Sequence, residues 1–309
     1  MQSIYAPRRL AASRFHQLRG WRYHAWHWSP DAPRPDAPLI VLLHGWMDVG
    51  ASFQFVVDAM RAGRAIIAPD WRGFGLTQGP AVDSYWFYDY LGDLDALLER
   101  LSPTAPVDLV GHSMGGNVAM MYAGVRPHRV RRLVNLEGFG MPRTDASQAP
   151  GRLADWLDEL ARPQALSGYA SVDAVASRLQ KNNPMLPSDK AAWLAQQWAS
   201  PDDAGRWHLR ADAAHKRTNP VLYRVDEVLA TWRRITAPIL WVEGDLTDVE
   251  KWWGHRYPRS EFHERLAAVS APVEKHLLSP CGHMLHHDQP RALATLIEDF
   301  VDRPDAASP

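Results

Sequence analysis

The most constraining feature of this sequence is the segment 111–115 (GHSMG), which stands between a strand-like run and a helix-like run. Residues 107–110 (VDLV) are short and largely apolar, as in a buried strand, and residues 117–125 follow with a helical pattern. Glycines two positions before and after a serine allow a strand-to-helix turn that is too tight for a Cβ at either position. The pattern therefore predicts that the hydroxyl of Ser113 is presented at the carboxyl edge of a sheet.

Other strand-like runs alternate with helical patterns along the chain. Short apolar runs bounded by turn residues are typical of parallel strands that are covered on both faces. Residues 15–28 instead favour an antiparallel hairpin at a sheet edge. We therefore predict an α/β fold with a doubly wound, mostly parallel, eight-stranded sheet. Its further strands are expected at residues 39–43, 65–68, 107–110, 130–136, 238–243 and 273–278.

One long segment interrupts this alternation. Between Gly138 and about Ile235 no strand-like run occurs, and the pattern is helical with breaks at prolines. We predict a core domain made of residues 1–138 and 236–309, with a helical cap of residues 139–235 inserted after the sixth strand.

Composition excludes several classes of partner. The 309 residues carry a formal net charge of −1, so there is no excess of positive charge for nucleic acid or an anionic membrane. No stretch reaches the roughly 18 apolar residues of a membrane span. No apolar leader follows Met1, and the single cysteine, Cys281, excludes an internal disulfide. We expect a cytoplasmic monomer or homodimer that acts on a small molecule.

Four motifs together resemble the cap-bearing branch of the α/β-hydrolase fold family. They follow the third, fourth, fifth and eighth expected strands, and they are residues 44–46 (HGW), 70–75 (DWRGFG), 111–115 (GHSMG) and 282–283 (GH). The match extends over roughly residues 39–300. Within the family, residues 44–48 (HGWMD) and 179–184 (LQKNNP) are similar to the serine-hydrolase-like subgroup. The resemblance implies a hydrolase that needs no cofactor.

The same resemblance implies roles for particular residues. Ser113 is expected to attack a carbonyl carbon and form an acyl-enzyme, with His283 as the base. The backbone N–H groups of Trp46 and Met114 are expected to form the oxyanion hole. Residues expected to contact the substrate are His44, Gly45, His112, Trp252 and Trp253.

The acidic partner of His283 stays open between three residues. The family usually carries an aspartate three positions after the glycine that follows the seventh strand, and that position is Thr247 here. Asp248 is the first candidate and Asp245 the second. Glu137, at the end of the sixth strand, is the third, because some family members place the acid there. A carboxylate that loses this role would be a solvated loop residue.

Metal binding is conceivable where His286 and His287 follow His283. No carboxylate that could complete such a site stands out in the sequence, so we predict no metal.

The sequence favours a serine hydrolase of small to medium apolar carboxylic esters, thioesters or lactones. A basic stretch at residues 210–217 of the cap would favour an alternative, hydrolysis of a carbon–carbon bond in a diketone-like acid. A non-catalytic, ligand-binding member of the fold is the third possibility.

Overall fold

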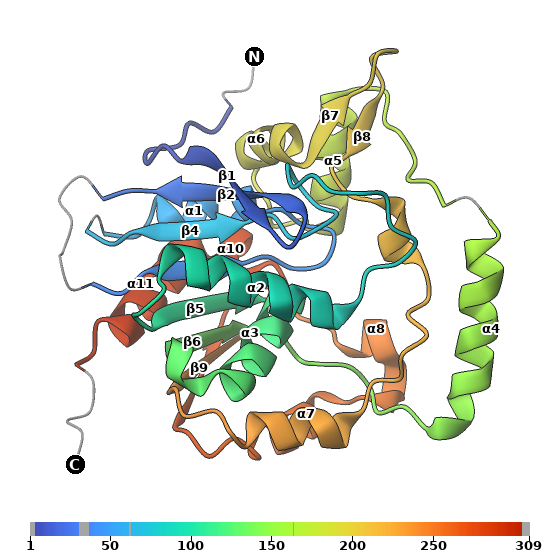
Figure 1. Cartoon of the computed structure of the whole chain (residues 1–309). Coiled ribbons are helices and arrows are strands. Elements are labelled where there is room, and N and C mark those ends of the chain that lie inside the picture. The colour runs from blue at the N-terminus through green and yellow to red at the C-terminus, as the bar shows by residue number, and fades with distance from the viewer. Residues whose placement is uncertain (1–3, 31–36, 62, 163, 305–309) are drawn as a thin grey trace.

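An eight-stranded sheet forms the centre of the molecule (Figure 1). The computed structural model describes residues 4–30, 37–61, 63–162 and 164–304. The strand order is β1-β2-β4-β3-β5-β6-β9-β10, with β1 and β2 joined antiparallel at one edge and the strands from β4 onward parallel. The predicted fold class is therefore confirmed. The strands are β1 (Ala12–Leu18), β2 (Trp21–Trp28), β3 (Ile40–Leu43), β4 (Ile66–Pro69), β5 (Val107–His112), β6 (Val130–Leu136), β9 (Ile239–Gly244) and β10 (Val273–Leu278).

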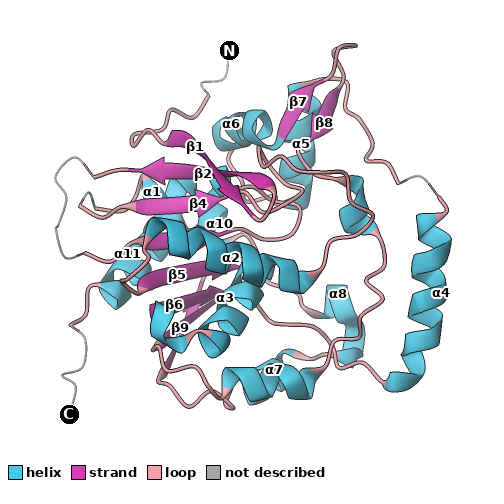
Figure 2. Ribbon diagram, viewed as in Figure 1, coloured by secondary structure: helices cyan, strands magenta, loops and turns pink. Residues whose placement is uncertain are grey.

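Helices cover both faces of the sheet (Figure 2). Alternate residues of the central strands serve the two faces: Val41 and Leu43 join one apolar cluster, and Ile40 and Leu42 join the other. The first face carries α2 (Phe87–Leu101), α3 (Met114–Val125), α7 (Val225–Trp232) and α9 (Arg259–Leu266), and the second carries α1 (Gln54–Val57), α10 (Leu285–Asp288) and α11 (Pro290–Val301). A short helix, α8 (Glu250–Trp253), follows β9. No helix in the described part of the chain combines the length and apolar character needed to cross a bilayer.

The segment between β6 and β9 departs in one respect from the helical pattern. It contains α4 (Ala149–Leu160), α5 (Val172–Asn182) and α6 (Ser188–Trp198), but also a two-stranded hairpin of β7 (Ala199–Pro201) and β8 (Trp207–Leu209). Strands of three residues are too short to show a period of two in the sequence. The expectation of a segment without strands was therefore wrong for this hairpin. The α5–α6 pair has its own apolar cluster, which receives Phe55 of the main domain.

The first and the last helix of this segment, α4 and α7, differ in how they pack. No residue of α4 is buried, and the helix stands apart at one side of the molecule (Figure 1). In contrast, α7 packs on the sheet side with α3, and its Val228 and Trp232 belong to the main apolar cluster. This packing favours a cap that ends before α7 rather than at residue 235.

Candidate active site

Ser113 occupies a strained turn between β5 and α3. Its backbone has φ 52° and ψ −115°, a conformation that side-chain-bearing residues rarely adopt. A Cβ at Gly111 would overlap the carbonyl oxygen of Gly115, and a Cβ at Gly115 would overlap that of Leu43. The two glycines are therefore required by the close approach of strand and helix, as the sequence pattern predicts.

His283 lies in the loop between β10 and α10, and Glu137 follows the last residue of β6. The two meet because His283 Nδ1 donates a hydrogen bond to Glu137 Oε2 at 2.6 Å. The Glu137 side chain is fully buried, whereas the His283 side chain is 25% exposed. This bond fixes the tautomer of the imidazole with the proton on Nδ1, which leaves Nε2 free to accept a proton.

Two further donors hold the Glu137 carboxylate. The N–H of Gly244 donates to Oε1 at 2.7 Å, and the hydroxyl of Thr247 donates to Oε2 at 3.0 Å. Glu137 itself has φ 54°, so its backbone also adopts the left-handed conformation. A buried carboxylate with three donors stays a hydrogen-bond acceptor in a defined orientation.

Asp248 and Asp245 lie elsewhere. Both are exposed; Asp248 Oδ1 accepts from the N–H of Lys251 at 3.1 Å. Asp245 accepts from the hydroxyl of Ser279 at 2.6 Å and from the N–H of Cys281 at 2.8 Å, which holds the pKa of this carboxyl below its ordinary value. The preference for these two residues as the partner of His283 does not agree with the geometry, which brings Glu137 to that position.

The loop after β3 passes close to the serine. A Cβ at Gly45 would lie 3.0 Å from His112 Nδ1 and 3.2 Å from Ser113 Cβ, so a side chain there would be crowded. Met47 has φ 57°, which turns the chain away after Trp46. Met114 is the first residue of α3, so its N–H has no acceptor within the helix. These positions are compatible with the expected roles of the Trp46 and Met114 N–H groups.

His44 and His112 are buried and hold the loops together. His44 Nδ1 donates to the carbonyl oxygen of Gly45 at 2.8 Å, and its Nε2 accepts from the N–H of Trp71 at 2.9 Å. His112 Nε2 donates to the carbonyl oxygen of His283 at 2.8 Å. Burial lowers the pKa of both imidazoles, most strongly that of His112. The expectation that these two histidines contact substrate therefore does not agree with their burial.

One tryptophan, Trp252, contacts the ring of His283, and the nearby loops carry two more. The Trp252 ring meets the His283 ring edge to face, with 4.5 Å between centroids, and 41% of Trp252 is exposed. Trp46 is 52% exposed. Trp253 instead packs against Tyr257, at 5.3 Å between ring centroids. Trp252 and Trp46 are thus placed to contact a ligand, whereas Trp253 supports the loop.

Two small cavities lie beneath the cap and away from the serine. They have volumes of about 10 and 50 Å³, and both are lined by Val49 and Arg210. Neither lining includes Ser113 or His283. Ser113 itself is partly exposed.

Cys281 is fully buried two residues before His283. Burial raises the pKa of its thiol well above the ordinary value. It is therefore a thiol and not a thiolate at neutral pH, which agrees with a packing role.

The chain belongs to the α/β-hydrolase fold family, because the family model matches residues 38–290. It is an α/β-fold hydrolase, and its relatives include a serine hydrolase-like protein of Danio rerio, 24% identical over 95% of this chain and 89% of the relative. A 2-hydroxy-6-oxo-2,4-heptadienoate hydrolase of Pseudomonas putida is 28% identical over 86% of this chain and 90% of its own length. Among solved structures, a thioesterase domain from the curacin biosynthetic pathway superposes with a TM-score of 0.79 and 26% identity, covering 93% of this chain and 99% of the domain.

Proposed function

We propose that this protein is a serine hydrolase of small to medium apolar carboxylic esters, thioesters or lactones, with Ser113, His283 and Glu137 as its catalytic triad. The observation that carries the proposal is the 2.6 Å hydrogen bond from His283 Nδ1 to the buried Glu137 carboxylate, in a loop next to the strained serine turn. A base with a fixed tautomer, oriented by a carboxylate, is what activation of a serine requires.

The proposed reaction runs in two halves. His283 Nε2 takes the proton of the Ser113 hydroxyl as its oxygen attacks the substrate carbonyl carbon, and the N–H groups of Trp46 and Met114 stabilise the oxyanion. The leaving alcohol or thiol receives the proton from His283, and an acyl-enzyme remains. Water then attacks the acyl group with the same base, which releases the acid and restores the serine. Glu137 stabilises the imidazolium in both halves.

The surroundings of His283 support an apolar substrate. Trp252 and Trp46 offer exposed aromatic surface beside the site. The basic stretch of the cap, in contrast, is engaged elsewhere: the His215 ring is stacked on Tyr85, and the Arg217 guanidinium binds the carbonyl oxygen of Asp83. These contacts occupy His215 and Arg217, two of the basic residues of that stretch.

A second candidate function is hydrolysis of a carbon–carbon bond in a keto acid. It is favoured by the relative named 2-hydroxy-6-oxo-2,4-heptadienoate hydrolase, whose match extends over 90% of its own length. The same serine, base and acid can serve both reactions, so the substrate must separate them.

Intact-mass spectrometry after treatment with a fluorophosphonate tests the nucleophile without knowledge of the substrate. The parent protein should gain a single adduct, and Ser113→Ala should gain none. Absence of an adduct on the parent, with circular dichroism showing a folded chain, would favour the ligand-binding member of the fold.

A substrate panel then tests the chemistry. p-Nitrophenyl esters of increasing acyl length, a thioester and a lactone are compared with a 2-hydroxy-6-oxo-dienoic acid. We expect turnover of the esters, with kcat/KM rising as the acyl chain grows to a medium length. Turnover of the keto acid alone would replace the ester proposal with the second candidate.

A further inference from the structure

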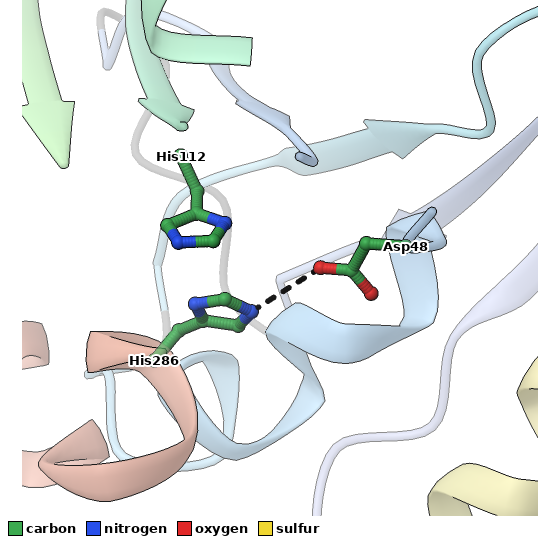
Figure 3. A group of neighbouring side chains, drawn as sticks. All are labelled: Asp48, His112 and His286. Atoms are coloured by element: carbon green, nitrogen blue, oxygen red, sulfur yellow. Dashed lines mark ion pairs between the residues drawn. The ribbon is translucent and has the colours of Figure 1, made fainter. Parts of the chain in front are cut away.

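A group of three buried side chains lies directly behind the candidate triad. Asp48 comes from the loop after β3, His112 from the end of β5 and His286 from α10, and one potential ligand atom of each lies within 4.8 Å of the other two (Figure 3). The exposed fractions are 3% for Asp48, 2% for His112 and 0% for His286. The rings of His112 and His286 are 4.5 Å apart between centroids, with the carboxylate beside them.

Each of these residues has a polar atom without a hydrogen-bond partner among the described residues. These atoms are Asp48 Oδ2, His112 Nδ1 and both ring nitrogens of His286. Buried polar atoms are almost always hydrogen-bonded, so three neighbouring residues with such atoms need an explanation. The contact closest to a bond is His286 Nε2 to Asp48 Oδ2 at 3.5 Å, which is long for a hydrogen bond.

The other side-chain atoms of these two residues, His112 Nε2 and Asp48 Oδ1, have hydrogen-bond partners. His112 Nε2 donates to the carbonyl oxygen of His283 at 2.8 Å, so the proton is on Nε2 and Nδ1 presents a lone pair. Asp48 Oδ1 accepts from the N–H of Val49 at 2.7 Å and from the hydroxyl of Ser52. Metal-binding imidazoles and carboxylates are oriented in this way, by a hydrogen bond on the atom that does not bind the ion.

An ion pair between His286 and Asp48 would leave His112 Nδ1 unexplained. That atom is an acceptor, because the ring proton is on Nε2, which donates to the carbonyl oxygen of His283. A cation that accepts one electron pair from each residue would give a partner to Asp48 Oδ2, to His112 Nδ1 and to one ring nitrogen of His286.

We propose that Asp48, His112 and His286 bind one divalent transition-metal ion with the preferences of zinc. Two imidazole nitrogens and one carboxylate oxygen suit zinc and leave a fourth position open. The 3.5 Å between His286 Nε2 and Asp48 Oδ2 matches two ligands of a tetrahedral zinc, about 3.4 Å apart for bonds of about 2.1 Å.

The proposed site differs from one expectation drawn from the sequence. We predicted no metal there because the histidines after residue 283 lacked a carboxylate. Asp48 supplies that carboxylate from the loop after β3, a contact that sequence spacing does not reveal.

An ion at this place would join the loop after β3, the end of β5 and helix α10 without touching substrate. Asp48 lies two residues after Trp46, His112 precedes Ser113, and His286 lies three residues after His283. The three residues would act as positioning residues for the oxyanion loop, the serine turn and the base. Bound metal is therefore expected to raise thermal stability as well as to change activity.

Metal binding can be measured on the full chain independently of turnover. The protein is stripped with a chelator, loaded with Zn²⁺ or Co²⁺, desalted and analysed for metal per chain. We expect one retained ion, visible ligand-field bands for Co²⁺, and a rise in Tm of roughly 5 °C in saturating zinc. Failure of the folded parent protein to retain any ion would overturn the proposal.

Variants locate the bound ion. His286→Gln and Asp48→Asn should each lose the retained ion and the rise in Tm. His27→Gln is the matched control, because His16 Nε2 and His27 Nε2 form a second imidazole pair, 3.1 Å apart, on β1 and β2. Retention by the first two variants, or loss in His27→Gln, would place the ion elsewhere. If His286→Gln or Asp48→Asn fails to fold, the Co²⁺ spectra of the parent and of His27→Gln are compared. Identical spectra would show that the ion is not bound by the His16–His27 pair, and a lost spectrum in His27→Gln would overturn the proposal.

Discussion

The hydroxyl of Thr247 donates a 3.0 Å hydrogen bond to Oε2 of Glu137, the oxygen that His283 Nδ1 meets at 2.6 Å. Thr247 occupies the position at which the family resemblance predicts an aspartate. A second carboxylate there would be a like charge next to Glu137, and like charges at this distance disfavour ionisation of both. The hydroxyl instead supplies a donor. The acid, Glu137, thus follows β6, and a neutral residue, Thr247, stands in the loop after β9 and donates to it.

Glu137→Gln should lower kcat strongly while leaving the fold intact. The amide oxygen can still accept from Gly244, but the amide NH₂ in the other position would favour the wrong imidazole tautomer. We expect a loss of roughly 10³-fold or more in kcat for p-nitrophenyl butyrate, with a much smaller change in KM.

Asp248→Asn is the matched control for this change. Its side chain is exposed and accepts only from a backbone N–H in its own turn, so kcat should stay within about threefold of the parent. A large loss in Asp248→Asn together with an active Glu137→Gln would remove Glu137 from the triad.

Thr247→Val tests the neutral partner of the carboxylate. Valine has the same shape but donates no hydrogen bond, so the Glu137 carboxylate would keep two of its three donors. We expect kcat to fall by about tenfold or less, because a hydrogen bond to a charged group contributes on the order of 1.5–3 kcal/mol and only part of it changes during the reaction. Thr247→Ser should restore most of the activity; if it is as impaired as Thr247→Val, the hydroxyl is not the cause.

The parts of the site that lie within one local pattern were predictable, and the parts that depend on contacts between distant segments were not. Ser113 is identified by glycines whose spacing follows from a single turn. The partner of His283 depends instead on how the ends of β6 and β9 meet, and the sequence offered three carboxylates, with Asp248 first, Asp245 second and Glu137 third. Asp248 was favoured because it is next to the usual position, yet its side chain points to solvent.

The sequence also could not show which histidine side chains are buried. Histidines beside glycines, such as His44 and His112, have the same pattern whether they face a ligand or brace a loop. The predicted fold class, a mostly parallel sheet, was confirmed. Its central strands could be recognised in the sequence because they carry apolar residues for both faces of the sheet. The β7–β8 hairpin was missed because each strand has only three residues, and the hydrogen-bonded pairing that defines the hairpin cannot be seen in so short a sequence pattern.

Acidic pH should destabilise the protein through His215. Its ring is stacked between Phe74 and Tyr85, with centroid distances of 3.8 and 3.7 Å. Burial lowers the pKa of His215 from 6.5 to about 4. The unfolded chain therefore binds this proton first, so the free energy of unfolding is highest above pH 6.5 and falls as the pH drops toward 4.

The measurement is urea unfolding of the parent and of His215→Phe at pH 7 and pH 5. Phenylalanine keeps the aromatic stack without a titrating group. The loss of stability between the two pH values should be smaller in the variant by about 1–2 kcal/mol. An equal loss in both proteins would mean that other groups cause the acid sensitivity.

Cys281 should resist thiol reagents in the native protein. Its side chain is fully buried and burial raises its pKa, so no thiolate is presented to a disulfide reagent such as DTNB. We expect no reaction until denaturant is added, and then one thiol per chain, since the sequence holds a single cysteine. Rapid native labelling, or loss of fluorophosphonate reactivity in Cys281→Ala, would contradict a packing role.

The position of Glu137 has a consequence for how this protein can diversify. His112 and Leu136 are register partners on neighbouring strands, so the residues that follow them, Ser113 and Glu137, are set by the same sheet. The segment beyond Thr247, with Trp252 beside the base, does not have to carry a carboxylate. Under the proposed triad, exchange of residues 250–256, by evolution or by grafting, would change the surface beside His283 and leave Ser113, His283 and Glu137 in place.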